Sequence, residues 1–178
     1  MAEETLRLDI ADLACGSPGL TPEEGESRGQ AASVCMVNQG HNSPTPTRLS
    51  GDYSQICDLV WKTPNQQATR CWNDMQEATE RGAYGIAALI VQQLMGLWIV
   101  ERSRKGTGFD FWLGPRGTDG LLFQDKTRLE VSGILNGDDA DISYRLESKV
   151  RQMRRSTGPG VAIVVEFGSP ECRIRRTC

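Results

Sequence analysis

Residues 104–135, with the sequence "RKGTGFDFWLGPRGTDGLLFQDKTRLEVSGIL", decide the fold. They hold two apolar runs rich in aromatic and β-branched residues, separated by glycine-rich turn signals, and this pattern predicts two neighbouring β-strands. Each run carries one carboxylate, Asp110 in the first and Glu130 in the second. Burying a carboxylate is costly unless a partner compensates for the lost water. The two acids therefore indicate either a functional site or a pair of structural ion pairs.

The flanking sequence extends these two strands into a longer order of elements. Residues 97–103 predict a strand before them, so that short turns join three strands into an antiparallel meander. A helical stretch over residues 64–95 precedes the meander. A second helical period over residues 136–156 and a continuous apolar strand over residues 161–167 follow it. From residue 64 onward, the sequence thus predicts helix, three strands, helix, strand.

We expect one compact α/β domain with a mixed sheet flanked by helices. Residues 1–62 are predicted to be an N-terminal extension that packs on a core of residues 63–178. The extension holds a short strand and a helix capped by Thr21, with residues 48–61 ambiguous between strand and helix. Residues 168–178 are expected to form a loop or a short edge strand.

Composition limits the class of protein. The chain has 178 residues, of which 38% are hydrophobic. No apolar run reaches the roughly 18 residues that would predict a membrane span. The acidic start is unlike a signal peptide, and the six scattered cysteines contain no CxxC pair, so we expect a cytoplasmic protein with reduced thiols. A single histidine, His41, argues against sites built on several histidines.

Charge is unevenly distributed along the chain. Residues 1–60 hold 9 acidic and 3 basic side chains, whereas residues 61–178 hold 14 acidic and 17 basic side chains. The basic excess fits a nucleic-acid partner, with Arg145, Lys149, Arg154 and Lys105 as candidate phosphate contacts. The alternative interpretation, a solvated helix face followed by a loose tail, stays open.

Strand alternation predicts where the two acids point. Asp110 should share a face with Trp112, and Glu130 should share a face with Lys126 and Ser132. Pairing of adjacent strands would then bring Asp110 and Glu130 together, where they repel unless a cation lies between them. A hard divalent ion such as Mg²⁺ or Mn²⁺ suits oxygen ligands and stabilises charge on a phosphate. The competing prediction is that the acids form ion pairs with Arg102, Arg104 or Arg128 across the sheet.

The αβββαβ order, with Asp110 on the second strand and Glu130 opening an E-x-S triplet on the third, resembles the PD-(D/E)xK nuclease superfamily. The resemblance covers about residues 64–167 and implies a restriction endonuclease-like core that cleaves DNA or RNA. It implies that Asp110 and Glu130 bind Mg²⁺ or Mn²⁺. It also implies a further acid from the first core helix, either Glu77 or, by preference, Glu80. A homodimer is compatible with this family.

The chain departs from the family pattern at Ser132, which occupies the position of the motif lysine. Lys126, or Lys105 from the preceding turn, is then the candidate replacement. The second predicted function is a catalytically inactive module that serves as a protein-interaction subunit of a bacterial defence or toxin complex. A nuclease should show a concave acidic pocket with a basic rim. An inactive module should instead show arginine-paired acids and an exposed apolar patch.

Overall fold

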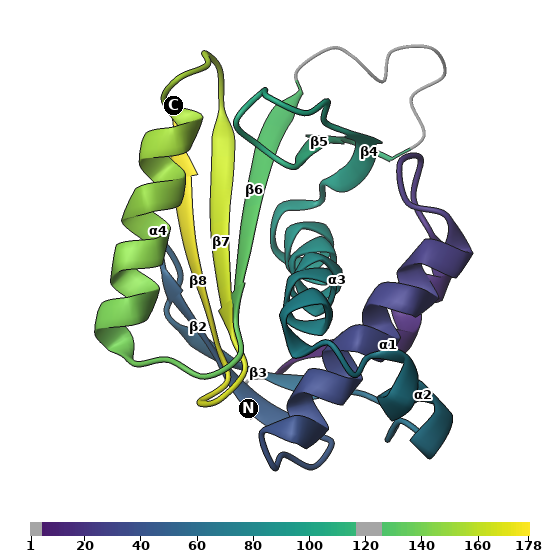
Figure 1. Cartoon of the computed structure of the whole chain (residues 1–178). Coiled ribbons are helices and arrows are strands. Elements are labelled where there is room, and N and C mark those ends of the chain that lie inside the picture. Colours follow the sequence, from purple (N-terminus) through teal and green to yellow (C-terminus); the bar gives the residue numbers. More distant parts are fainter. Residues whose placement is uncertain (1–4, 117–125) are drawn as a thin grey trace.

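The computed structural model describes residues 5–116 and 126–178. Within these residues the strands form one mixed sheet of eight strands, in the order β1-β3-β2-β8-β7-β6-β5-β4, with helices on both faces (Figure 1). The strands are β1 (Leu6–Asp9), β2 (Thr45–Gly51), β3 (Gln55–Val60), β4 (Trp98–Arg102), β5 (Phe111–Gly114), β6 (Thr127–Ile134), β7 (Gly160–Glu166) and β8 (Glu171–Thr177). The helices are η1 (Ile10–Cys15), α1 (Pro22–Asn38), α2 (Gln66–Cys71), α3 (Met75–Met95) and α4 (Asp139–Met153). The prediction of an α/β protein is confirmed.

The predicted order of elements from residue 64 onward is also present. Strands β4, β5 and β6 form an antiparallel meander, and β7 returns through α4 to pair in parallel with β6. Phe111 pairs with Leu129 and Trp112 with Arg128, which places the residues just before β5 beside the middle of β6. Part of the β5–β6 connection, residues 117–125, lies outside the described residues.

The helical stretch from residue 64 was predicted to be continuous, and this is wrong. It divides into α2 and α3, because Asp74 adopts an extended conformation and its side chain accepts hydrogen bonds from the backbone of Gln76 and Glu77. Asp74 thus begins α3 as its N-cap. The apolar second half of α3 is buried as expected, and Gly82 lies so close to α1 that a Cβ there would be 2.8 Å from Ala32 Cα.

The prediction for the C-terminal tail is corrected as well. Residues 171–177 form β8, an interior strand between β7 and β2. The arginines that suggested a loose tail are bound instead, since Arg173 contacts Glu171, Asp139 and Ser143. The ambiguous segment of residues 48–61 lies within the β2–β3 hairpin. β8 therefore joins the strands of the N-terminal extension to the rest of the sheet.

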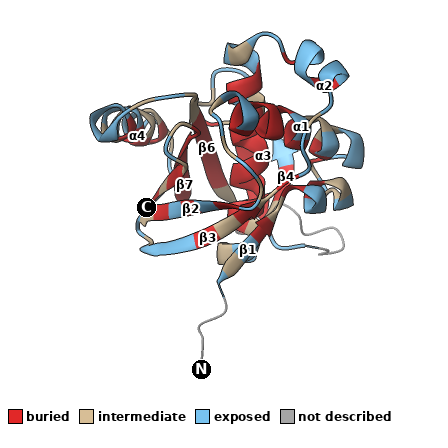
Figure 2. Ribbon diagram, turned by 90° about the horizontal axis from the view of Figure 1, so that it is seen from below, coloured by how far each residue is buried: buried red, intermediate tan, exposed pale blue. Residues whose placement is uncertain are grey.

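Buried residues fill α3 and the strands β6 and β7 in Figure 2, and each face of the sheet has its own apolar cluster. Helices α1 and α3 cover one face, where Val131, Val161 and Ile163 belong to the larger core. Helix α4 covers the other face with a stripe of Ile142, Leu146, Val150 and Met153. The six cysteines are free thiols. None of the described helices is both long and apolar enough to pass through a bilayer.

A buried carboxylate holds the turn that follows β7. Glu166 is 1% exposed and accepts hydrogen bonds from the backbone of Gly137, Gly168 and Ser169. It thereby ties the segment before α4 to the end of β7, the strand next to β6.

Candidate active site

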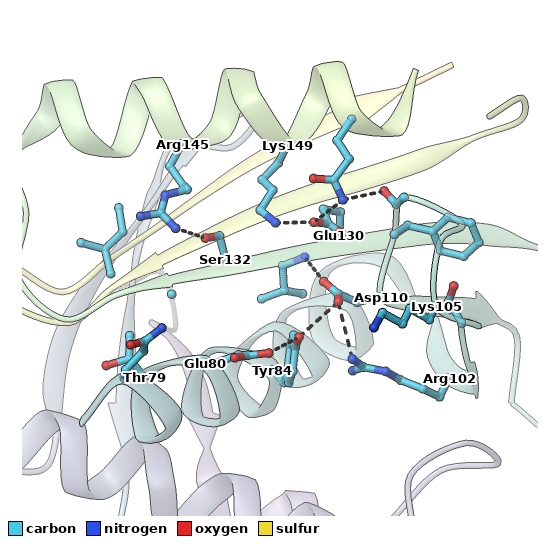
Figure 3. A pocket seen from close by; sticks show the side chains of 18 of the residues that line it. Thr79, Glu80, Tyr84, Arg102, Lys105, Asp110, Glu130, Ser132, Arg145 and Lys149 are labelled. Carbon is cyan, nitrogen blue, oxygen red and sulfur yellow. Dashed lines mark hydrogen bonds and ion pairs between the residues drawn. The ribbon is translucent and has the colours of Figure 1, made fainter. Parts of the chain in front are cut away.

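A cavity of about 1010 Å³ opens between α3, α4 and the loop that joins β4 to β5. The residues of β6 line its floor (Figure 3). Three carboxylates, Glu80, Asp110 and Glu130, line this cavity together with five cations, which are Arg102, Arg104, Lys105, Arg145 and Lys149. The cavity therefore combines an acidic pair with a basic surround.

Asp110 lies immediately before β5, at the point where the pairing of β5 with β6 ends. Its backbone N–H donates to Leu129 O at 2.9 Å, and its Oδ2 accepts from the backbone N–H of Val131 at 2.9 Å. The Asp110 carboxylate thus accepts the hydrogen bond from β6 that a backbone carbonyl of β5 would accept if the strand pairing continued. Its other oxygen accepts from the hydroxyl of Tyr84 at 3.1 Å and lies 3.7 Å from Arg102 Nη2.

Glu130 stands on β6 and faces α4. Its side chain is only 3% exposed, and its Oε1 accepts from Lys149 Nζ at 2.5 Å and from Gln152 Nε2 at 3.3 Å. Burial, followed by the neighbouring charge of Asp110, raises the pKa of Glu130 to about 7, although Lys149 acts in the opposite direction. The predicted meeting of the two acids is therefore observed, since the charge of Asp110 acts on Glu130.

Helix α4 supplies the cations next to Glu130. Lys149 contacts Glu130, and one turn earlier Arg145 Nη1 donates to Ser132 Oγ at 3.2 Å. Residues four apart on a helix lie on the same face, so Arg145 and Lys149 form one row above β6. Ser132, at the position where the family resemblance expects a lysine, is thus paired with an arginine from the facing helix.

Tyr84 connects Asp110 to α3. Its hydroxyl lies 2.9 Å from Glu80 Oε1 and 3.1 Å from Asp110 Oδ1. Burial, with Asp110 next, raises the pKa of Tyr84 above its usual range, so the phenol stays protonated. A phenol has a single hydrogen to donate, so it cannot satisfy both carboxylates at once. The Tyr84 hydroxyl therefore lies between the carboxylates of Glu80 and Asp110.

Several predicted site residues meet at this cavity and others do not. Those that line it are Asp110, Glu130, Ser132, Glu80, Arg145, Lys149 and Lys105. Glu77 is exposed on α3 and is not part of the lining, and Arg154 follows the end of α4 away from the cavity. Lys126 is not part of the lining either, and its Nζ lies 3.3 Å from Glu101 Oε2 and 5.0 Å from the centre of the Trp112 ring. The structure thus does not bring Lys126 to the acids.

The predicted ion pairs of the acids with arginine are realised only in part. Arg102 approaches Asp110, but the partner of Glu130 is a lysine. Arg128 is turned away, since its guanidinium donates to the carbonyl oxygens of Met153 and Ser156 at the end of α4. Arg128 therefore stabilises the end of this helix instead of neutralising an acid.

The donor set suits a hard cation that keeps some of its water. Mg²⁺ commonly uses one or two carboxylates, with waters and substrate phosphates in its remaining positions. Asp110 and Glu130 supply such oxygens. The Glu80 carboxylate lies on the other side of the Tyr84 hydroxyl from Asp110. Within residues 5–116 and 126–178, no group of three or more His, Cys, Asp or Glu side chains is close enough to hold a metal ion alone.

Sequence reasoning named Arg102 only as a possible ion-pair partner of the acids, and it did not place Tyr84 or Gln152 at the site. Tyr84 and Arg102 appear only when α3, β4 and β5 are packed together, because they are far apart in the sequence. The position of Gln152 could have been predicted from the sequence of α4. Arg145, Lys149 and Gln152 follow the spacing i, i+4, i+7, which defines a polar stripe beside the apolar stripe of α4.

Comparisons with known proteins give no evidence on function, so the cavity itself is the basis for an assignment. No protein-family profile matches the chain, and searches of curated proteins and of solved structures find no match.

Proposed function

We propose that this protein is a metal-dependent phosphodiesterase of the PD-(D/E)xK, restriction endonuclease-like type, acting on DNA or RNA. One observation carries the proposal: Asp110, immediately before β5, meets Glu130 of β6 in a cavity lined by five cations, and Lys149 contacts Glu130. Such a cavity attracts the phosphate backbone to a pair of oxygen ligands. The helix–meander–helix–strand order supports the same assignment.

The lysine of this site comes from α4 in our proposal. The motif position holds Ser132, and Lys149 places its ammonium group on Glu130 from the opposite side of the cavity. A positive group here opposes the rise in the pKa of Glu130 and so favours the anionic form that binds a metal. Lys149 is also placed to donate to a water or a phosphate oxygen beside Glu130.

The remaining groups of the cavity have roles that follow from their charges or their hydrogen bonds. Asp110 and Glu130 would hold Mg²⁺ or Mn²⁺, which when bound polarises a phosphate and activates water. Tyr84 keeps Asp110 oriented, and Glu80 stands ready to accept a proton or bind an outer water. Arg102, Arg104, Lys105 and Arg145 surround the acids and neutralise charge on the nucleic-acid backbone.

The alternative, an inactive interaction module, predicted an exposed apolar patch. In the described part of the chain the exposed large apolar side chains are Val37, Ile56 and Tyr144, which lie on α1, β3 and α4 respectively. Isolated side chains of this kind are common on protein surfaces. The cavity, with its concave acidic floor and basic surround, matches the nuclease prediction better.

The proposal is tested by calorimetric titration of Mn²⁺ into the wild type and into a variant with Asp110→Ala and Glu130→Ala. We expect binding in the wild type and none in the double variant. Cleavage of labelled single- and double-stranded DNA and RNA is then measured in Mg²⁺ and in EDTA, and we expect activity only with the metal.

Glu77→Ala and Glu80→Ala form a matched pair of controls, because both acids are exposed on α3 but only Glu80 lines the cavity. Glu80→Ala should weaken Mn²⁺ binding, and Glu77→Ala should leave it unchanged. If the wild type binds no Mn²⁺ and the double variant is merely less stable, the acids are structural and the interaction module is the better assignment.

A further inference from the structure

Gln152 of α4 contacts both the loop that joins β4 to β5 and the buried acid of β6. Its side-chain nitrogen donates to Gly108 O at 3.2 Å and to Glu130 Oε1 at 3.3 Å. Gly108 belongs to the loop of residues 103–109 between β4 and β5, and Glu130 belongs to β6. A single amide group from α4 thus holds the loop against the buried carboxylate.

The orientation of this amide follows from chemistry. Both partners of Gln152 are acceptors, a carbonyl oxygen and a carboxyl oxygen, so the –NH₂ end must face them. Its two hydrogens match the two acceptors. A carboxylate at this position would have no hydrogen to offer and would face two oxygens, so glutamate is a nearly isosteric variant that reverses the contact.

The loop held by Gln152 carries two of the cations that line the cavity. Arg104 and Lys105 are exposed and line the cavity from the loop. Gly106 and Gly108 have φ values of 93° and 84°, which side-chain-bearing residues rarely adopt, so the loop depends on glycine for its shape. Asp110 follows the loop directly, so a displacement of residues 104–108 also moves the second carboxylate.

We infer that Gln152 is a positioning residue that couples phosphate binding on the loop of residues 103–109 to cation binding at Asp110 and Glu130. A phosphate held by Arg104 and Lys105 stabilises the loop in the position where Gln152 contacts both Gly108 and Glu130. The cation then meets a carboxylate pair that is already ordered. By reciprocity, the cation strengthens binding of the phosphate by the same factor. The nature of both ligands rests on the proposed function, whereas the contact itself does not.

The contact is tested on the free protein by limited trypsin digestion, followed by mass spectrometry of cleavage after Arg104 and Lys105. Gln152→Ala and Gln152→Glu should accelerate cleavage at these two positions by about tenfold, the effect of losing one hydrogen bond. The matched control is Gln76→Ala, because Gln76 also lines the cavity from a helix but is exposed. Trypsin should cleave the Gln76→Ala variant after Arg104 and Lys105 at the wild-type rate. Urea unfolding of each variant separates loop release from a general loss of stability.

The coupling is tested with a 12-nucleotide phosphorothioate single strand, which resists cleavage, in anisotropy titrations with and without Mn²⁺. In the wild type and in Gln76→Ala, Mn²⁺ should tighten oligonucleotide binding by about five- to tenfold, within the range typical of coupled sites. In both Gln152 variants this ratio should fall towards one while each ligand alone still binds. A merely structural role would weaken both ligands and leave the ratio unchanged.

The outcomes separate the two claims. If the wild type binds no Mn²⁺, the proposed function fails, and the trypsin result still decides whether Gln152 holds the loop. If the wild type binds Mn²⁺ and the Gln152 variants keep both the wild-type digestion rate and the wild-type ratio, the inference is overturned and the proposed function stands.

Discussion

Glu130 and Lys149 are 19 residues apart in sequence, yet Lys149 Nζ lies 2.5 Å from Glu130 Oε1. The strand and the helix that follows it thus share one charged contact across the cavity. This arrangement explains how a serine at position 132 is compatible with a cation beside the acid pair, because the cation comes from α4.

Replacing Lys149 by methionine should slow phosphodiester cleavage by roughly a hundredfold or more, the usual scale for loss of a group that donates in the reaction. The side chain keeps most of its length but loses the charge that contacts Glu130. Rates are measured on the best substrate found, at saturating Mg²⁺.

Lys126→Met is the matched control, because Lys126 is placed near Glu101 and Trp112 and not at the acids. It should retain nearly full activity. A result in which Lys126→Met is inactive and Lys149→Met is active would restore the sequence-based assignment of Lys126.

The raised pKa of Glu130 predicts a pH-dependent stability. The native carboxyl titrates at about 7 against an ordinary value of 4.5, so between these values the native state binds a proton that the unfolded state has lost. The free energy of unfolding in metal-free buffer should therefore fall as pH rises from 4.5 to 7. The contribution of Glu130 to this fall is roughly 3 kcal/mol.

Glu130→Gln removes the titrating group and should flatten that part of the profile. Urea unfolding of both proteins at pH 5, 6, 7 and 8 measures the difference. Parallel profiles for wild type and variant would show that the buried acid does not titrate in this range.

Tyr84→Phe should weaken Mn²⁺ binding by about tenfold, as is common when a group that orients a metal ligand is removed. The phenol is the described contact between Glu80 and Asp110, and without it Asp110 loses the hydrogen bond that α3 donates to its Oδ1. Calorimetry gives the affinity. Tyr144→Phe, at a tyrosine that is 71% exposed, serves as the control and should bind Mn²⁺ like the wild type.

Glu166→Ala should destabilise the protein by about 3 kcal/mol, because three backbone N–H groups lose their acceptor in a buried turn. Glu166→Gln keeps one acceptor oxygen and should cost less. Urea unfolding measures both, with the exposed Glu23 changed to alanine as a reference. Equal stability of the two Glu166 variants would show that the number of acceptor oxygens is unimportant there.

The sequence was sufficient to predict the elements with strong local patterns. The alternation around Asp110 and Glu130 gave the meander and the meeting of the two acids, because strand faces have a period of two residues. The all-apolar run of β7 identified a strand covered on both faces. Asp74 is a typical N-cap residue, so the break between α2 and α3 was readable in principle.

Other features depend on contacts that no local pattern encodes. β8 contains four charged residues and resembles a solvated tail until Glu171 and Arg173 are seen to neutralise each other. The choice of Lys149 over Lys126 was similarly hidden. From sequence, Lys126 or Lys105 was the candidate replacement and Lys149 only a candidate phosphate contact. Only the placement of α4 above β6 brings Lys149 to Glu130.

The insertion of β8 between β7 and β2 has a consequence for how the protein is made. Arg48 of β2 pairs in register with Glu171 of β8, so the sheet joins segments whose pairing residues are 123 positions apart. During synthesis, β1, β2 and β3 emerge first and remain without their neighbour until residue 177 has left the ribosome. Until then β2 presents an open edge, which is a known route to aggregation. We therefore expect the sheet to close only after residues 171–177 have emerged, and folding to depend on chaperones when the chain is produced quickly.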